Sequence, residues 1–181
     1  MGTATFLFDP VIVRAVGAAL AVILILGALA KLRDLELFRY AVENYRLLPA
    51  GLVAPFARAF ALLELAAGML LVVQATQTVA AWLACGVLAV ATGAVMLSLQ
   101  RGLDRIECGC GGNGQRISWG LVGRNAVLAA GLVLVSLGEL PRPLGTFDYG
   151  SVAGIALALL GLYACANQLL ANQPLLKEIH S

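Results

Sequence analysis

Apolar residues dominate five stretches of this chain, each close to the length of about 20 residues that an α-helix needs to cross a bilayer. The stretches cover residues 11–30, 55–74, 78–99, 119–137 and 149–170. Their apolar positions are continuous rather than alternating, which favours helices, because only helices or closed barrels satisfy the backbone in lipid. We therefore predict an all-α integral membrane bundle of about five transmembrane helices, forming one polytopic domain over residues 1–181.

The segment between the first two stretches, residues 31–54, mixes polar and apolar residues. Large apolar side chains recur there every three or four positions, the spacing of one helical face, at Leu35, Phe38, Val42 and Tyr45. The charged residues fall mostly elsewhere. This pattern predicts a short amphipathic helix at the membrane interface, ended by Pro49 and Gly51.

Five crossings place the first and third connections on the same side of the membrane. These connections are residues 31–54 and 100–118, and we call the side that carries them the active face. The amphipathic helix therefore shares this face with the third connection, which contains the most reactive side chains of the chain.

Composition agrees with a membrane protein and excludes some functions. The chain is 61% hydrophobic and 12% charged, whereas soluble domains are roughly half apolar and a quarter charged. The net charge is only +2, and no basic, aromatic-rich face of the kind that binds nucleic acid is present. No small-residue cleavage site precedes Lys31, so we expect residues 11–30 to be a retained helix rather than a signal peptide.

Ionisable side chains occur inside two of the predicted spans, where they normally point inward and have a partner. Glu64 lies within the second span, and Arg124, followed by Asn125, lies within the fourth. We expect Glu64 and Arg124 to reach each other across the bundle, and Lys31 to extend its ammonium group toward the interface. Such a pair could fix the register of the helices, or it could tune a nearby thiol or relay a proton to it.

Of the four cysteines, only Cys108 and Cys110 are spaced for joint chemistry. Cys85 and Cys165 lie in apolar runs, where a cysteine usually serves as a small packing residue. Gly109 permits the bend that a disulfide between such close neighbours requires, and a strained, exposed disulfide exchanges readily. The sequence thus favours a redox-active pair. No stand-alone catalytic machinery is evident beyond thiol–disulfide oxidoreductase chemistry at this pair.

Other interpretations of the pair remain open. One pair does not supply the four ligands of structural zinc, although a dimer could, and copper(I) could use two thiolates. The thiols could also stay reduced in a scaffold or small-solute transporter that depends on Glu64. A quinone could serve as a cofactor, but no sequence motif supports one. Because a relay across the membrane needs a second pair or a bound carrier, we expect disulfide exchange with a separate thiol protein.

The chain resembles the MauE family of methylamine-utilisation proteins, within the wider MauE/DoxX-like group of redox-associated membrane proteins. The resemblance rests on Lys31, Phe38 through Tyr45, Leu47-Leu48-Pro49, Glu64 with Gly68, Cys108-Gly109-Cys110-Gly111, Ile117-Ser118-Trp119 and Arg124-Asn125. It implies a multi-pass protein of the bacterial inner membrane that assists maturation of the disulfide-rich beta subunit of periplasmic methylamine dehydrogenase. It also implies a membrane-anchored, thioredoxin-like partner of the MauD type.

The charge distribution and the resemblance predict opposite orientations in the membrane. Of the 12 lysines and arginines, all but Arg14 and Arg142 belong to the active-face half. The positive-inside rule therefore places the active face in the cytoplasm. A role in periplasmic disulfide chemistry implies the opposite side, so the sequence leaves both orientations open.

Overall fold

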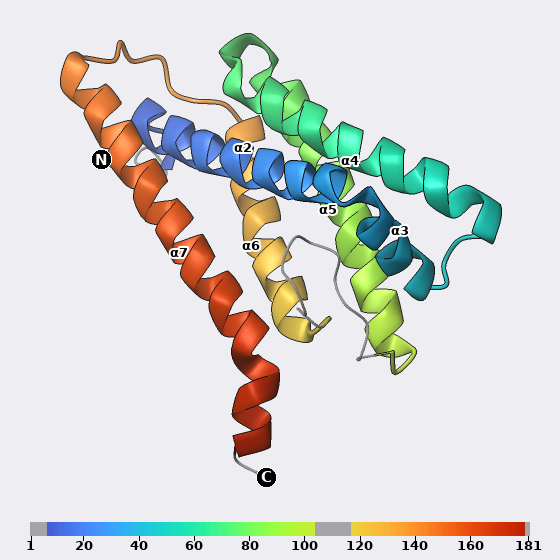
Figure 1. Ribbon diagram of the computed structural model, residues 1–181. Coiled ribbons are helices and arrows are strands. Elements are labelled where there is room, and N and C mark those ends of the chain that lie inside the picture. The colour runs from blue at the N-terminus through green and yellow to red at the C-terminus, as the bar shows by residue number, and fades with distance from the viewer. Residues whose placement is uncertain (1–6, 104–116, 180–181) are drawn as a thin grey trace.

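A computed structural model of the chain describes residues 7–103 and 117–179, and describes side chains as far as residue 172. All the regular structure formed by these residues is helical (Figure 1). The elements are α2 (Pro10–Arg33), α3 (Leu35–Asn44), α4 (Ala50–Val72), the 3-10 turn η1 (Gln74–Thr76), α5 (Gln77–Gln100), α6 (Trp119–Ser136) and α7 (Thr146–Ile179). The predicted all-α fold is confirmed.

Five of these helices are long and apolar enough to cross a membrane: α2, α4, α5, α6 and α7. They match the five predicted spans, but α4 starts at Ala50 rather than near Pro55. Pro55 lies inside α4, where its missing N–H removes one intrahelical hydrogen bond, and the helix continues through it. The prediction that Pro49 and Gly51 end the amphipathic helix was wrong. That helix ends at Asn44, Arg46 adopts a left-handed φ of 51°, and Gly51 lies inside α4.

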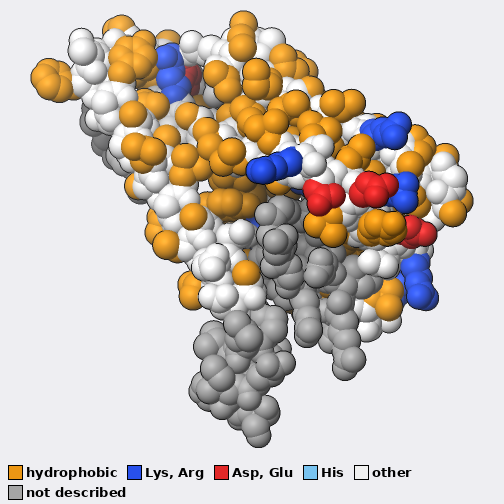
Figure 2. Space-filling model, in the orientation of Figure 1, with side chains coloured by type: hydrophobic (Ala, Val, Ile, Leu, Met, Phe, Trp, Pro, Cys, Tyr) orange, Lys and Arg blue, Asp and Glu red, His pale blue; other side chains and the backbone are white. Residues whose placement is uncertain are grey.

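The outward faces of the long helices carry large apolar side chains. Exposed examples on α4, α5 and α7 are Leu62, Met69, Val72, Val79, Trp82, Leu157, Leu162 and Leu169. Figure 2 shows apolar side chains over most of one face, with charged side chains gathered over α3 and the start of α4. Such a surface suits lipid rather than water. The chain is a multi-pass membrane protein.

The amphipathic helix α3 packs its apolar face against the bundle, as its sequence pattern predicts. Phe38 and Val42 form a buried cluster with residues of α4 and α5 that include Phe60 and Val87. The charged side chains on its other face, including Glu36 and Glu43, are exposed. Asp34 caps the start of α3, because its carboxylate accepts a hydrogen bond from the Leu37 backbone N–H at 3.0 Å.

Helices α2 and α4 make the most extensive contact in the bundle. Gly68 permits it: a Cβ atom at this position would lie 2.8 Å from Ile25 Cγ1 and 3.1 Å from the Ile25 backbone nitrogen. Glycine at such a crossing lets two membrane helices approach closely. The close approach brings the last turn of α2 against the middle of α4.

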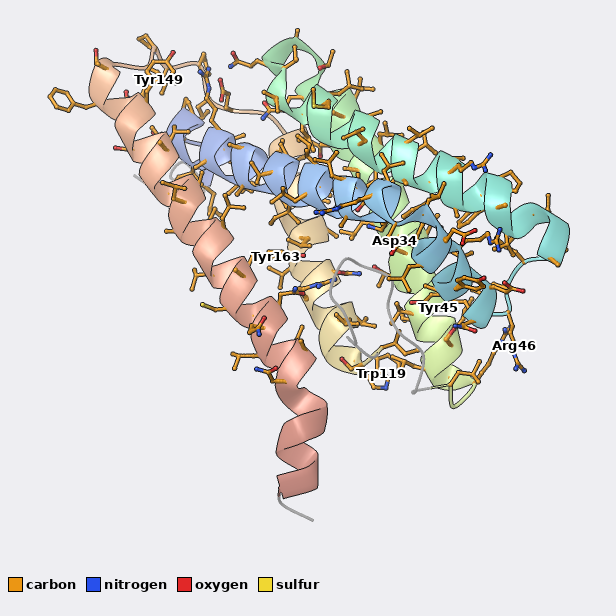
Figure 3. All side chains as sticks on the ribbon, in the orientation of Figure 1. Asp34, Tyr45, Arg46, Trp119, Tyr149 and Tyr163 are labelled. Carbon is orange, nitrogen blue, oxygen red and sulfur yellow. The ribbon has the colours of Figure 1, made fainter. Side chains whose placement is uncertain are left out.

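The two ends of the bundle differ in what holds them together. At one end, Tyr45 after α3 packs against Ile117 before α6, which places the first and third connections at the same end as predicted. At the other end, Arg14 pairs with Glu139, and Arg142 pairs with both Asp9 and Asp148. Figure 3 shows Tyr45 and Trp119 toward the first end and Tyr149 at the opposite end.

Candidate functional site: a polar chamber near the active face

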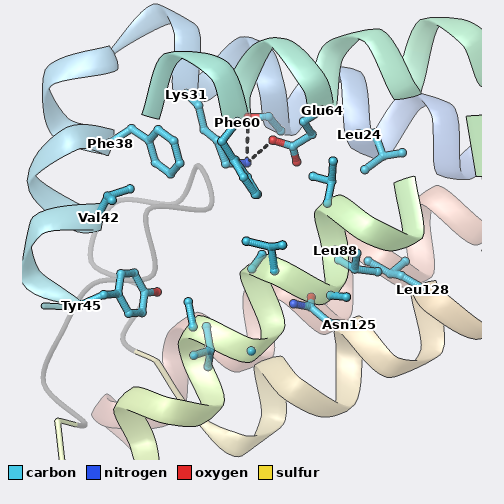
Figure 4. A pocket seen from close by; sticks show the side chains of 18 of the residues that line it. Leu24, Lys31, Phe38, Val42, Tyr45, Phe60, Glu64, Leu88, Asn125 and Leu128 are labelled. Atoms are coloured by element: carbon cyan, nitrogen blue, oxygen red, sulfur yellow. Dashed lines mark hydrogen bonds and ion pairs between the residues drawn. The ribbon is translucent and has the colours of Figure 1, made fainter. Parts of the chain in front are cut away.

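A cavity of about 390 Å³ lies among the helices on the active-face side of the bundle. Figure 4 shows Lys31, Phe38 and Glu64 on one side of it and Leu88 and Asn125 on the other. Most of the lining is aliphatic or aromatic, and the polar side chains are few. This combination is typical of small-molecule sites, which have volumes of about 300–1,000 Å³. We call this cavity the polar chamber.

A buried ion pair forms one wall of the polar chamber. Lys31, in the last turn of α2, donates a hydrogen bond from Nζ to Glu64 Oε2 at 2.7 Å, and a second to the Gly27 carbonyl at 3.3 Å. The Lys31 and Glu64 side chains are only 6% and 11% exposed. A Cβ atom at Gly27 would lie 3.2 Å from Glu64 Oε1. Glycine at this position therefore gives the carboxylate room to reach the lysine.

Two expectations from the sequence were wrong at this point. Glu64 pairs with Lys31 and not with Arg124. Lys31 does not extend to the interface, because its ammonium group turns inward to the carboxylate and lies 5.7 Å from the centre of the Phe38 ring. The reason is the tight α2–α4 crossing. It brings the end of α2, where Lys31 lies, against the middle of α4, where Glu64 lies.

Arg124 and Asn125 form a separate polar network on α6. Arg124 donates to Asn125 Oδ1 from Nε at 3.2 Å and from Nη2 at 3.0 Å, and to Asn167 Oδ1 on α7 at 2.6 Å. Asn125 Nδ2 donates to the Thr92 hydroxyl on α5 at 3.0 Å. The Thr92 hydroxyl in turn donates to the Leu88 carbonyl at 2.7 Å. This network connects α5, α6 and α7 through hydrogen bonds that satisfy polar groups within the spans.

All four supporting residues predicted from the sequence, Lys31, Glu64, Arg124 and Asn125, line the polar chamber. Sequence reasoning missed Thr92, Asn167 and Tyr163, which contact the Arg124–Asn125 network or its arginine. Isolated polar residues within apolar spans were the available signal for Thr92 and Asn167.

The predicted catalytic pair, Cys108 and Cys110, lies outside the described residues. The residues on either side of it are described: the Leu103 backbone N–H donates to the Ser98 carbonyl at 3.0 Å, and Ile117 is buried against Tyr45 and Leu121. Leu103 and Ile117 are thus both at the end of the bundle that carries α3. Cys85 and Cys165 are free thiols on α5 and α7.

The chain is similar in sequence to proteins of one named family. The family model described as methylamine utilisation protein MauE matches residues 9–138, which include the polar chamber's ion pair and both Cys108 and Cys110. A methylamine utilization protein MauE from Paracoccus denitrificans is 35% identical over 89% of each chain. Proteins of the same name from Methylorubrum extorquens and Paracoccus versutus are 39% and 40% identical, over 85% and 84% of this chain and 86% and 84% of theirs. No solved structure matches the chain. With a family match over most of its length and relatives aligned over nearly all of it, this multi-pass membrane protein belongs to the MauE family of methylamine utilisation proteins.

Proposed function

We propose that this protein acts in the bacterial inner membrane as a thiol–disulfide accessory factor, using Cys108 and Cys110, for maturation of the beta subunit of methylamine dehydrogenase. Its partner is a membrane-anchored, thioredoxin-like protein of the MauD type. The observation that carries the proposal is membership of a methylamine utilisation family in a chain with one closely spaced cysteine pair. The two other cysteines lie on separate helices, α5 and α7, and form no disulfide with each other.

The proposed chemistry is disulfide exchange. A thiolate of one protein attacks a disulfide sulfur of the other, a mixed disulfide forms, and the thiolate of the broken bond leaves. The second cysteine of the attacking pair then resolves the mixed disulfide. Two electrons pass in total, so one pair is reduced as the other is oxidised. Lys31, Glu64, Arg124 and Asn125 support this chemistry from the polar chamber.

Trapping the mixed disulfide tests the proposal. In a Cys110→Ser variant the resolving thiol is absent if Cys108 attacks first, and Cys108→Ser tests the reverse order. We expect one of the two variants to accumulate a covalent complex with the thioredoxin-like partner that disappears on reduction. We also expect Cys108→Ser to stop maturation of the beta subunit while the bundle remains folded, as judged by gel filtration and circular dichroism.

Cys85→Ser and Cys165→Ser are the matched controls, since both residues are free thiols of the same chain. Both control variants should mature the client normally. Full maturation in the Cys108→Ser/Cys110→Ser double variant would remove the redox function and favour a scaffold or transporter.

A further inference from the structure

We propose that the polar chamber binds the head group of a lipid-soluble quinone, with the isoprenoid tail in an adjoining apolar cavity. Binding follows from the chamber itself, whereas the role of the quinone as electron acceptor for Cys108 and Cys110 rests on the proposed function. The proposal therefore separates into a binding statement and an electron-transfer statement, which different measurements test.

The chamber suits a flat ring with an apolar rim. Phe38, Phe56 and Phe60 line one side, with ring centres of neighbouring pairs 5.7 and 6.0 Å apart. Aromatic walls favour planar ligands, because rings pack in offset or tilted arrangements. Val90 and Leu97 of α5 also belong to the lining and are 51% and 46% exposed. The chamber itself is partly open rather than an enclosed cavity, so a ligand can enter it.

A second cavity, of about 730 Å³, supplies space for a tail. It lies among α2, α6 and α7, and its lining is apolar except for Arg124 and Tyr163. Both cavities share four lining residues: Ile23, Arg124, Leu128 and Tyr163. A molecule with a polar ring and a long hydrocarbon chain matches this pair of cavities better than a small hydrophilic solute, which would leave the apolar cavity unused.

The ion pair provides a donor for a carbonyl oxygen of the ring. An ammonium group has three hydrogens, and among the described residues Lys31 uses two, toward Glu64 and the Gly27 carbonyl. Lys31 lines the chamber, and its third hydrogen has no hydrogen-bond acceptor among the described residues, so it can donate to a ligand oxygen. A hydrogen bond donated by Lys31 favours the negative charge that develops on a quinone oxygen during reduction, although Glu64 offsets part of the ammonium charge.

The electron balance closes with a quinone as acceptor. When the thiols of Cys108 and Cys110 form a disulfide, they release two electrons and two protons. A quinone takes up both electrons and both protons and becomes a quinol. The described helices contain no second cysteine pair that could accept these electrons. A quinone supplies instead an acceptor that diffuses in the membrane.

Direct binding of decylubiquinone, a short-tailed benzoquinone, tests the inference on the full chain in quinone-free lipid nanodiscs. Gly93 lines the chamber, and a Cβ there meets no atom within 4 Å, so Gly93→Leu adds side-chain volume at the chamber wall from a position where the Cβ itself fits. Gly86→Leu is the matched control: it lies two turns earlier on α5, is equally open, and is outside the chamber lining. We expect saturable binding that Gly93→Leu weakens by about tenfold or more and Gly86→Leu leaves unchanged.

The absence of saturable binding, or equal binding by the two leucine variants, would overturn the inference. Competition by palmitate as effective as that by unlabelled quinone would also overturn it, because the chamber would then accept any acyl chain. The Cys108→Ser/Cys110→Ser double variant should bind decylubiquinone normally but no longer reduce it. Normal binding by the wild-type protein without thiol-dependent reduction would refute the electron-transfer role and leave the binding site established.

Discussion

At the scale of single residues, the Lys31–Glu64 ion pair dominates the polar chamber, because both charges are almost completely buried. Burying two charges costs free energy that their attraction and hydrogen bonds must offset. Removing one partner leaves the other charge uncompensated in an apolar bundle, which is worse than removing both.

We therefore expect Lys31→Met to destabilise the protein by about 3–5 kcal/mol, and the Lys31→Met/Glu64→Met double variant to recover much of that loss. Unfolding of the purified variants in one detergent, followed by circular dichroism, measures the difference. Arg14→Met at the more exposed Arg14–Glu139 pair is the control and should cost less, since these side chains are 26% and 22% exposed. A double variant as unstable as the sum of the two single variants would contradict this expectation.

A second prediction at this scale concerns Asp9, at the opposite end of the bundle. Its Oδ1 accepts a hydrogen bond from the Val11 backbone N–H at 2.9 Å and contacts Arg142 at 3.1 Å. These contacts, the backbone hydrogen bond first, hold the pKa of Asp9 below its ordinary value. Its contribution to stability is therefore complete above the ordinary pKa of an aspartate and is lost as the pH falls through the lowered value.

The Asp9→Ala variant should accordingly unfold at a lower temperature than the wild type at neutral pH. The difference should shrink as the pH is lowered through and below the ordinary range of an aspartate, where Asp9 becomes protonated. Thermal unfolding at a series of pH values checks this. A difference that is independent of pH would mean that the carboxylate charge does not contribute.

The charged and amide residues of the chamber lining, Lys31, Glu64, Arg124 and Asn125, were singled out from the sequence, but their partners were not. Charged and amide side chains inside apolar spans are conspicuous, which is why Glu64, Arg124 and Asn125 were singled out. Which of them meet depends on the rotation of each helix and on its crossing angle. Those quantities follow from tertiary contacts such as the Gly68–Ile25 approach, which a single sequence does not reveal.

At the scale of elements, the α2–α4 crossing positions the site. Five long apolar stretches and the three-to-four spacing of α3 were sufficient to predict the helices. The end of α3 and the start of α4 were not predicted correctly, because Pro49, Gly51 and Pro55 suggest breaks, whereas Pro49 caps α4 and the helix runs through Gly51 and Pro55. At Gly68 the two backbones come close together, since a Cβ there would lie 3.1 Å from the Ile25 backbone nitrogen and 3.2 Å from the Ala21 carbonyl oxygen.

We expect Gly68→Ala to push α2 and α4 apart, since the added Cβ would lie only 2.8 Å from Ile25 Cγ1 and 3.2 Å from the Ala21 carbonyl oxygen. Overpacking of this kind typically costs about 1–3 kcal/mol. Gly86→Ala, in open space on α5, is the control and should be neutral or stabilising, because alanine has the higher helix propensity. Thermal unfolding of the two purified variants in the same detergent compares their stability directly. Equal stability would show that the crossing has room to adjust.

At the scale of the whole molecule, the unequal distribution of charge bears on orientation. The two arginines at the far end are both paired with carboxylates, whereas Arg33, Arg46, Arg58 and Arg101 on the active-face half are exposed. The structure therefore keeps the asymmetry that places the active face in the cytoplasm by the positive-inside rule. Direct exchange with a periplasmic client requires the opposite orientation.

The proposed function accordingly predicts that a membrane-impermeant maleimide labels Cys108 or Cys110 in intact cells after mild reduction. The Cys108→Ser/Cys110→Ser double variant should lose this labelling, which excludes a signal from Cys85 or Cys165. Labelling that appears only after lysis would support the charge rule and refute direct exchange on the periplasmic side.

The Lys31–Glu64 pair also has a consequence for the order in which the chain is assembled. The two residues are 33 positions apart, so α2 reaches the bilayer ahead of the helix that carries its counter-charge. A lone carboxylate is unfavourable in hydrocarbon, and α4 therefore inserts at lower cost if α2 is still beside it. The α2–α3–α4 segment is then the shortest N-terminal part of the chain in which both charges of the pair are present and can neutralise each other.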